Sequence, residues 1–143
     1  MTTPNGGRLE WVTEHMDRYL ATDGEDGHLW RDGIPTLLLT TTGSKSGKAT
    51  TTPLIYGQDG DNYMVIGSRG GAPSHPQWYL NLSADSGVQV QVKADKFNAR
   101  ARTASPEEKP RLWGIMAKIY PPYDEYQGRT DREIPVIILE RAP

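Results

Sequence analysis

The sequence contains no cysteine, a single phenylalanine and no long apolar run among its 143 residues. The absence of cysteine excludes disulfide bonds, thiolate metal sites, iron–sulfur clusters and cysteine nucleophiles. The longest apolar stretches, Leu37–Leu39 and Val136–Leu139, are far too short to span a bilayer. Because the first residues also lack the layout of a secretory signal, we expect a cytoplasmic protein.

The chain also carries little net charge. Its 16 lysines and arginines nearly balance 18 aspartates and glutamates, which gives a net charge of −2 with the histidines neutral. General nucleic-acid binders need a clear basic excess, so we expect no nucleic-acid partner. The three histidines, His15, His28 and His75, are scattered without metal-ligand spacing, so we expect no metal site.

Residue periodicity predicts three helices and six strands. The first helix covers about residues 8–22, after a polar tail at 1–7 that we expect to be flexible. Further helices are predicted from Pro76 to about 84, and from Ser105 to about 120 with Ser105 as N-cap and Pro106 in the first turn. The predicted strands cover residues 35–42, 50–58, 62–68, 88–92, 97–102 and 134–140.

The order of these elements indicates the fold class. Strands follow one another through hairpins, and Gln58–Asn62 is a typical hairpin sequence. The strand–helix alternation of a parallel α/β fold is absent. We therefore predict a mainly β (α+β) protein of one domain, residues 8–143, in which about six antiparallel strands close into a small barrel with flanking helices.

The first candidate site is the glycine-rich turn Thr42–Lys48. Gly43 and Gly47 free the backbone to aim its N–H groups at one point, and Lys45 and Lys48 add positive charge. This composition is typical of an anion cradle. It is not a nucleotide-binding P-loop, because the glycines are one residue too close and alanine occupies the magnesium-binding position. The alternative is an ordinary solvated hairpin turn.

The second candidate site is the segment Ser68–Tyr79. Its arginine, Arg69, supplies a planar cation, and the glycine pair after it lets a ligand approach the main chain. The helix that begins at Pro76 favours an anion at its N-terminus, and Trp78 adds flat aromatic surface. The segment suits a flat, acidic ligand that carries phosphate. The alternative is a plain connection with Trp78 in the core.

Three tyrosines at three-residue steps form the third candidate site: Tyr120, Tyr123 and Tyr126. They follow the last predicted helix, and we expect an exposed loop over residues 121–130. Tyrosines in such a row can wall a pocket and donate hydrogen bonds. The alternative is that they pack the loop against the barrel. If the row is functional, it and the basic turn should form opposite ends of one crevice.

Together these segments resemble the deazaflavin-dependent nitroreductase family of actinobacterial oxidoreductases. The resemblance is carried by LLLTTTGSKSGKATTTPLIYGQDGDNYMVIGSRGGAPSHPQWYLNL, VQVQV and IYPPYDEYQGRTDREIPVIIL. It implies a split β-barrel similar to the FMN-binding split barrels, and the cofactor coenzyme F-420, an 8-hydroxy-5-deazaflavin. The implied activity is hydride transfer from the reduced cofactor to an electron-poor acceptor such as a quinone, an enone or a nitroaromatic.

The resemblance also implies roles for individual residues. The implied cofactor-binding residues are Thr42, Gly43, Ser44, Lys45, Ser46, Gly47, Lys48, Thr50, Pro53, Ser68, Arg69, Gly70, Gly71, Ala72, Trp78 and Tyr79. The implied catalytic residues are Tyr123, Tyr126, Tyr120 and Ser68. Their hydroxyls would stabilise negative charge on the acceptor. Ser44 and Thr50 stand where family loops commonly carry arginine, which should weaken the grip on a phosphate.

Several alternatives stay open at this point. An FMN-dependent reductase would have the same fold, so FMN is the second cofactor to consider. A non-catalytic protein that binds deazaflavin or quinone is another. We expect a small-molecule electron acceptor and no stable membrane insertion. Weak contact with the inner face of the cell membrane through the first helix is a minor alternative, since its polar side, which includes His15, has no strong basic face. Monomer and homodimer are equally open.

Overall fold

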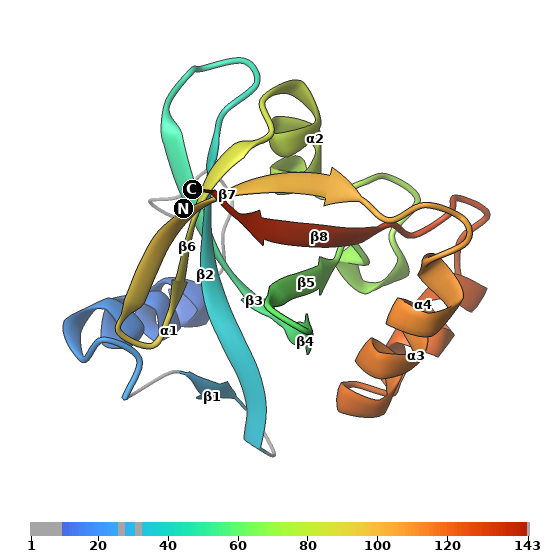
Figure 1. The fold of residues 1–143 in the computed structure, drawn as a ribbon, viewed down its shortest axis with the longest axis horizontal. Helices are drawn as coiled ribbons and strands as arrows, with labels where there is room; N and C mark the ends of the chain where they lie inside the picture. Colours follow the sequence, from blue (N-terminus) through green and yellow to red (C-terminus); the bar gives the residue numbers. More distant parts are fainter. Residues whose placement is uncertain (1–9, 26–27, 31–32, 143) are drawn as a thin grey trace.

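The structure is a computed structural model that describes residues 10–25, 28–30 and 33–142 (Figure 1). The predicted tail at 1–7 lies outside the described residues. The elements in chain order are α1 (Glu10–Ala21), β1 (Leu29–Trp30), β2 (Ile34–Thr42), β3 (Ala49–Ile55), β4 (Gly57–Asp59), β5 (Asn62–Ile66), the 3-10 turn η2 (Arg69–Gly71), α2 (Gln77–Ala84), β6 (Gly87–Val92), β7 (Asp95–Thr103), α3 (Lys109–Ile119), α4 (Pro122–Gly128) and β8 (Val136–Arg141).

The strands form one antiparallel sheet, which confirms the predicted class. Its order is β1-β2-β6-β7-β8-β5-β4, with β3 paired to β2 as well. The six longer strands correspond to the six predicted ones. The strand predicted over 50–58 is divided into β3 and the short β4, and β1 was not predicted. The sheet bends strongly, so that β3 at one end of the sheet comes into contact with β5 near the other end. The bent sheet thus forms a split barrel (Figure 1). The helices lie outside this barrel.

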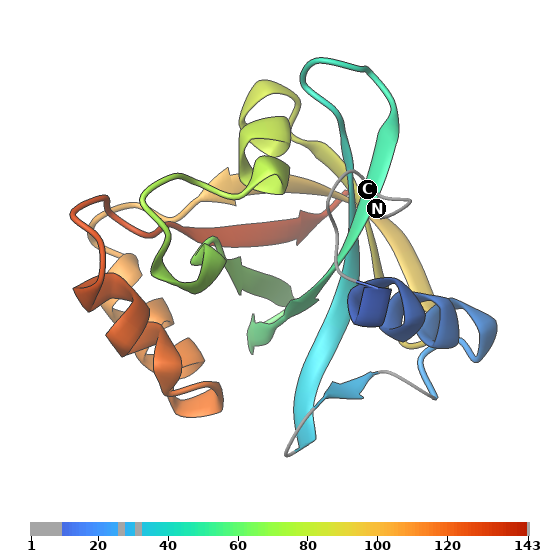
Figure 2. The same ribbon diagram turned by 180° about the vertical axis from the view of Figure 1, so that it is seen from behind.

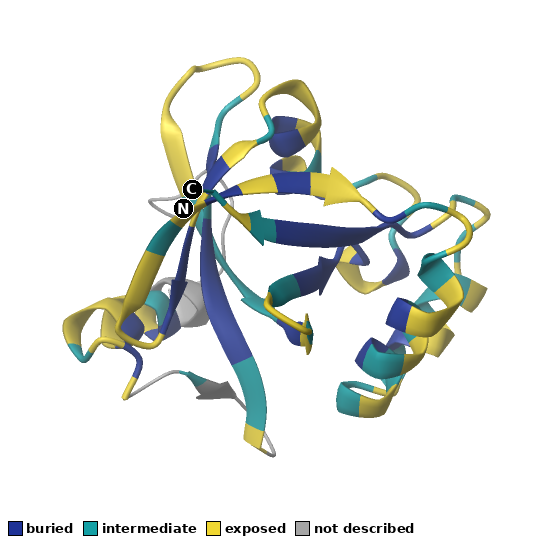
Figure 3. Cartoon of the chain, viewed as in Figure 1, coloured by how far each residue is buried: buried dark blue, intermediate teal, exposed yellow. Residues whose placement is uncertain are grey.

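The core has two parts, one on each face of β5 and β8. In β5, Val65 points into the barrel, whereas Met64 and Ile66 pack beneath α3 and α4. In β8, Ile137 and Ile138 divide between the two faces in the same way. Side chains alternate between the faces of a strand, so a strand covered on both faces is apolar at successive positions. Most of β8 is accordingly buried (Figure 3).

Two predictions about the helices were wrong. The third helix was expected to begin at Ser105, but α3 begins at Lys109. Ser105 and Glu108 form a capping box one turn earlier: the Ser105 N–H donates to Glu108 Oε1 at 3.0 Å, and the Glu108 N–H donates to Ser105 Oγ at 3.3 Å. Pro110 lacks the N–H that would continue this turn into the helix.

The predicted loop at 121–130 is instead largely helix α4. The preceding helix ends at Ile119, close to the predicted end at about 120, and Pro122 is the first residue of α4. Proline suits the first turn of a helix because the N–H there has no intrahelical partner, and the acidic Asp124 and Glu125 suit the positive helix end. Among the described residues, no helix is both long and apolar enough to cross a membrane.

Candidate functional site

A pocket of about 500 Å³ lies between β3, β5, η2, α1 and α4. In Figure 2, η2 and α4 lie to the left of the view and α1 lies to the right. The pocket is lined by His15, Thr36, Thr52, Pro53, Leu54, Ile55, Ile66, Ser68, Arg69, Gly70, Pro76, Trp78, Tyr120, Tyr123 and Tyr126. Binding pockets for small molecules commonly have volumes of about 300–1,000 Å³, so this one has room for an organic ligand.

The three tyrosines form one wall of the pocket. Their rings make a single aromatic cluster, with centroids 5.0 Å apart for Tyr120 and Tyr123 and 6.2 Å apart for Tyr123 and Tyr126. The hydroxyls of Tyr120 and Tyr126 are 3.2 Å apart and share a hydrogen bond. Both tyrosines of α4 lie on one helix face because they are three residues apart.

Tyr123 differs from the other two tyrosines in its burial. Its side chain is 4% exposed, which contradicts the expected exposed loop. Burial raises the pKa of its hydroxyl above the ordinary value, and the neighbouring Tyr120 and Tyr126 raise it further. In the part of the chain that the structure describes, every fully buried side-chain polar atom has a hydrogen-bond partner. The Tyr123 hydroxyl has no partner among those residues, so it borders the open pocket.

The turn Ser68–Ala72 forms the wall next to the tyrosines, because η2 packs against α4. Three consecutive residues have positive φ values: Arg69 at 46°, Gly70 at 62° and Gly71 at 81°. This conformation is uncommon for a residue with a side chain, so Arg69 is held there by its surroundings. The Arg69 guanidinium donates to Ser74 Oγ at 2.6 Å. The turn thus brings a cation to the pocket edge, within a wall that also includes Ser68 and Gly70.

The basic turn Gly43–Lys48 does not line this pocket. It lies at the exposed end of the β2–β3 hairpin, beside α2 (Figures 1 and 3). The Ser44 N–H donates to Asn81 Oδ1 at 3.1 Å, the Gly43 N–H to the Lys48 carbonyl at 2.8 Å, and the Gly47 N–H to the Gly43 carbonyl at 2.9 Å. These three amides already have acceptors within the protein, and the anion cradle expected at this turn stays a prediction. Only lysine side chains and the remaining amides are left to meet an anion.

The predicted site residues therefore divide into two sets. Those that line the pocket are Pro53, Ser68, Arg69, Gly70, Trp78, Tyr120, Tyr123 and Tyr126. Those outside its lining are Thr42, Gly43, Ser44, Lys45, Ser46, Gly47, Lys48, Thr50, Gly71, Ala72 and Tyr79. The lining of this pocket includes the three tyrosines and no residue of the basic turn. Tyr79 faces elsewhere, and its hydroxyl pairs with Thr103 Oγ1 at 3.2 Å.

Seven lining residues were not predicted: His15, Thr36, Thr52, Leu54, Ile55, Ile66 and Pro76. His15 was assigned to the polar side of the first helix, but its side chain is 7% exposed and meets the pocket. Periodicity cannot reveal this, because a polar residue that faces a pocket looks the same in the sequence as one that faces water. The three from β3, Thr52, Leu54 and Ile55, have ordinary strand character and carry no signal of their own.

The chemistry of this lining fits a flat heterocycle with an acidic edge. Pro53, Leu54, Ile66 and Trp78 give apolar surface, Arg69 gives positive charge, and the tyrosines and Ser68 give hydroxyls. An apolar pocket with a few convergent polar groups is typical of a cofactor or substrate site. Among the described residues, no cluster of three or more potential metal ligands is found.

Comparison with known proteins identifies related chains. A family model described as F420H(2)-dependent quinone reductase matches residues 11–141. An F420H(2)-dependent quinone reductase of Mycobacterium tuberculosis is 40% identical over 130 residues, which cover 89% of this chain and 87% of that protein. A solved structure of an F420-H2 dependent reductase is 43% identical, with a TM-score of 0.69 over 74% of this chain and 94% of that chain.

Two further solved structures bear on assembly and fold. One, described as a domain-swapped dimer, is 41% identical with a TM-score of 0.72, over 92% of this chain and 98% of that chain. The heme storage protein HutZ of Vibrio cholerae is 15% identical with a TM-score of 0.57, over 95% of this chain and 92% of that chain. At that identity the likeness extends to the fold alone.

Proposed function

The chain belongs to the F420H(2)-dependent quinone reductase family, and from this premise we propose which residues carry out its reaction. The protein is an oxidoreductase whose reductant is reduced coenzyme F-420. This makes F-420, and not FMN, the cofactor to be placed in the pocket. When bound, the reduced deazaflavin supplies a hydride to the acceptor, which is a quinone.

We propose that the turn Ser68–Gly70 and the apolar strip of Pro53, Leu54 and Trp78 bind the cofactor's ring. An apolar surface removes the flat ring from water, and Gly70 allows the ring edge to approach the main chain. Arg69 compensates negative charge at that edge. Lys45 and Lys48, exposed at the hairpin end, would contact only the more distant anionic part of the cofactor.

On the adjoining wall, the tyrosines bind the acceptor. Negative charge develops on a quinone oxygen as it is reduced, and a hydroxyl aimed at that oxygen stabilises it. Tyr123 is best suited to this role because its hydroxyl borders the pocket without a described partner. Its raised pKa makes it a poor proton donor at neutral pH, so its role is to hydrogen-bond the developing anion. Tyr126, paired with Tyr120, assists.

The observation that carries this proposal is the single pocket shared by Arg69, Ser68 and all three tyrosines. The test is to mix purified protein with reduced F-420 and menadione and to follow cofactor oxidation by absorbance. We expect oxidation that depends on protein and on quinone. Cofactor binding without turnover on any quinone would instead favour the non-catalytic carrier, and the proposed roles would then be wrong.

For assembly and location, we propose a cytoplasmic homodimer. The similar structure described as a domain-swapped dimer supports the dimer. Light scattering after size-exclusion chromatography tests it, and a monomeric mass at micromolar concentration would contradict it.

Sedimentation with anionic vesicles tests the minor alternative of peripheral membrane contact, and recovery of the protein in the pellet would support that alternative.

A further inference from the structure

Arg132 lies between α4 and β8, outside the pocket lining, yet its side chain holds the turn that forms one pocket wall. Its guanidinium makes four hydrogen bonds to that region. Nη2 donates to the Ser68 carbonyl at 2.7 Å, Nε to the Ala72 carbonyl at 2.8 Å, and Nη1 to the Gly67 carbonyl at 3.1 Å. Nη1 also donates to His75 Nδ1 at 3.1 Å. One planar group therefore fixes both ends of the turn.

The turn needs such support because its conformation is not intrinsically stable. Within it, the Gly71 N–H donates to the Ser68 carbonyl at 2.9 Å and the Ala72 N–H to the Arg69 carbonyl at 3.1 Å. These two bonds close the turn, but they do not fix the directions of the Gly67, Ser68 and Ala72 carbonyls. The Arg132 guanidinium fixes those directions, because all three carbonyls accept hydrogen bonds from it. The positive φ of Arg69 persists only where surrounding contacts outweigh its cost.

The main chain next to Arg132 is hydrogen-bonded to α4, the helix of the tyrosine wall. Gln127, on α4, donates from Nε2 to the Arg132 carbonyl at 2.9 Å. Its Oε1 accepts from the Ile134 N–H at 3.0 Å, so one amide side chain fixes residues 132–134 against the helix that carries Tyr123 and Tyr126. Arg132 is thus bound to α4 through its backbone and to the Ser68–Ala72 turn through its side chain.

We propose that Arg132 is a positioning residue that sets the spacing between the Ser68–Gly70 wall and the tyrosine wall, and hence the alignment of cofactor and acceptor. This inference rests on the proposed function of the two walls. Arginine is needed because four acceptors surround one guanidinium, and a fork of N–H donors can reach all of them whereas a lysine ammonium has only three donors. Small errors in the distance between reactants lower rates steeply.

The neighbouring histidine supports this assignment. To accept a hydrogen bond at Nδ1, the His75 ring must be neutral with its proton on Nε2. Burial lowers the pKa of His75, and the Arg132 charge lowers it further, so the acceptor form is favoured at neutral pH. The ring of His75 also packs on that of Tyr79, with centroids 4.7 Å apart, which holds it in place for Arg132.

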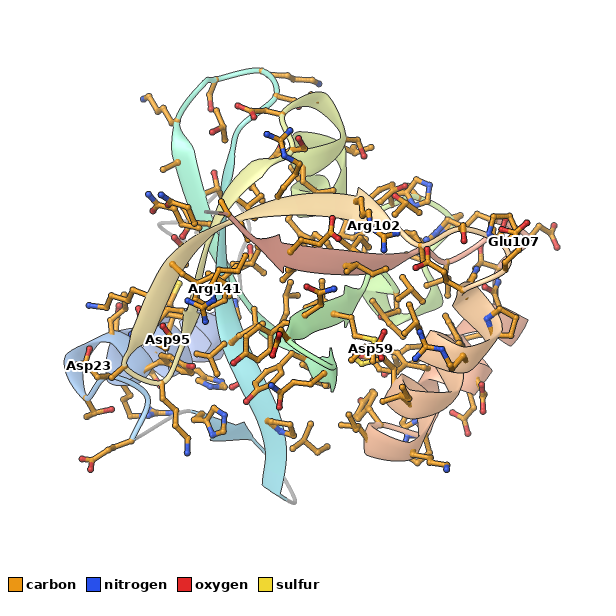
Figure 4. The ribbon with its side chains drawn as sticks, in the orientation of Figure 1. Asp23, Asp59, Asp95, Arg102, Glu107 and Arg141 are labelled. Carbon is orange, nitrogen blue, oxygen red and sulfur yellow. The ribbon has the colours of Figure 1, made fainter. Side chains whose placement is uncertain are left out.

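The test compares Arg132→Lys with Arg111→Lys. Arg111 makes a bidentate fork with Asp59 at 2.8 and 2.9 Å, in an exposed position away from the pocket (Figure 4 labels Asp59), so the second variant loses a similar fork without touching either wall. We expect Arg132→Lys to weaken F-420 binding, measured by fluorescence titration, about 10-fold and to lower kcat with menadione by about 10-fold to 100-fold. Arg111→Lys should change both less than twofold.

A second variant separates positioning from simple stability. Gln127→Ala cuts the link to α4 and leaves the guanidinium bonds intact, so it should raise KM for menadione with less than a twofold change in F-420 binding. Thermal unfolding shows which variants are folded at the assay temperature. If folded Arg132→Lys binds F-420 and turns over as the native protein does, the proposal is wrong. Inactive native protein would overturn the proposed function, whereas the binding titrations would still test Arg132.

Discussion

Two turns in this molecule look alike in the sequence but differ in the structure. Gly43–Lys48 and Ser68–Ala72 each follow a strand, contain two glycines and carry a basic residue. The first is exposed, and its amides are largely bonded within the hairpin and to Asn81. The second is packed between Arg132 and α4, and it lines the pocket. Glycine content shows where a chain turns, and the groups that surround the turn decide what it can do.

The difference is sharpest in the space around one glycine of each turn. A Cβ at Gly71 would lie 2.7 Å from the Tyr126 carbonyl oxygen and 3.1 Å from Tyr126 Cα. A Cβ at Gly47 would meet nothing within 4 Å, although its φ of +71° is similar to the +81° of Gly71. Alanine at Gly47 therefore tests the cost of a positive φ alone, and alanine at Gly71 tests that cost together with a clash against α4.

The largest effect is expected for Gly71→Ala. Its positive φ costs about 1–2 kcal/mol, and the clash with backbone adds about 1–3 kcal/mol of overpacking. Because the clashing atoms belong to α4, the walls must move apart, and turnover with menadione should be nearly lost. Gly47→Ala is the control and should cost about 1–2 kcal/mol of unfolding free energy with activity retained. Urea unfolding and steady-state kinetics measure both, and equal losses of activity would contradict the comparison.

Tyr123→Phe should have the next largest effect. It retains the ring packing and removes the hydroxyl that faces the acceptor, so kcat should fall about 100-fold with little change in melting temperature. Tyr63→Phe is the matched control, because Tyr63 stacks on Phe97 with centroids 5.7 Å apart and does not line the pocket. A raised pKa keeps the Tyr123 hydroxyl protonated in alkaline solution, so its ionisation should not limit the rate up to about pH 9. Unchanged kcat in Tyr123→Phe would remove it from the reaction.

The exposed turn offers a smaller effect. Lys45→Ala should weaken F-420 binding by about 1 kcal/mol in dilute buffer, because an exposed charge is screened by water and salt. Turnover at saturating cofactor should stay unchanged. Lys118→Ala, at an exposed position on α3, is the control and should leave binding unaltered. Fluorescence titration at two salt concentrations measures the effect. A loss that salt does not reduce would show that the turn closes over the cofactor.

The fold was predictable from the sequence because local patterns decide most of it. Alternation identified β6, and turn residues identified the hairpin between β4 and β5. The helix α4 was missed because a proline pair is as typical of a helix start as of a helix end, and only the packing of Tyr123 beneath Trp113 and Tyr120 distinguishes the two. Local sequence does not contain that information.

The site was predictable only where the resemblance or residue type carried it. Ser68, Arg69 and the tyrosines have chemistry that stands out, and all of them line the pocket. Arg132 did not stand out, because three of its four acceptors are carbonyls that lie about sixty residues earlier in the chain. The basic turn also stood out, but it does not line this pocket. The sequence does not show that three of its amides find partners within the hairpin and on α2.

The smallest effect concerns a guanidinium fork that holds neither wall. Arg102 donates to both oxygens of Glu108 at 2.8 and 3.0 Å on the surface (Figure 4 labels Arg102). This contact, with the Ser105 N–H, lowers the pKa of Glu108 to about 2. A lowered pKa means that the stabilisation is present above the unfolded-state value and is lost as pH falls towards 2. Glu108→Gln should therefore lower the melting temperature slightly at pH 7 and by less at pH 3, with F-420 binding unchanged at pH 7. Calorimetry at the two pH values measures this. If Glu108→Gln also weakened F-420 binding, guanidinium–carboxylate pairs on the surface would shape the pocket too. The positioning role proposed for Arg132 would then not be specific to that residue.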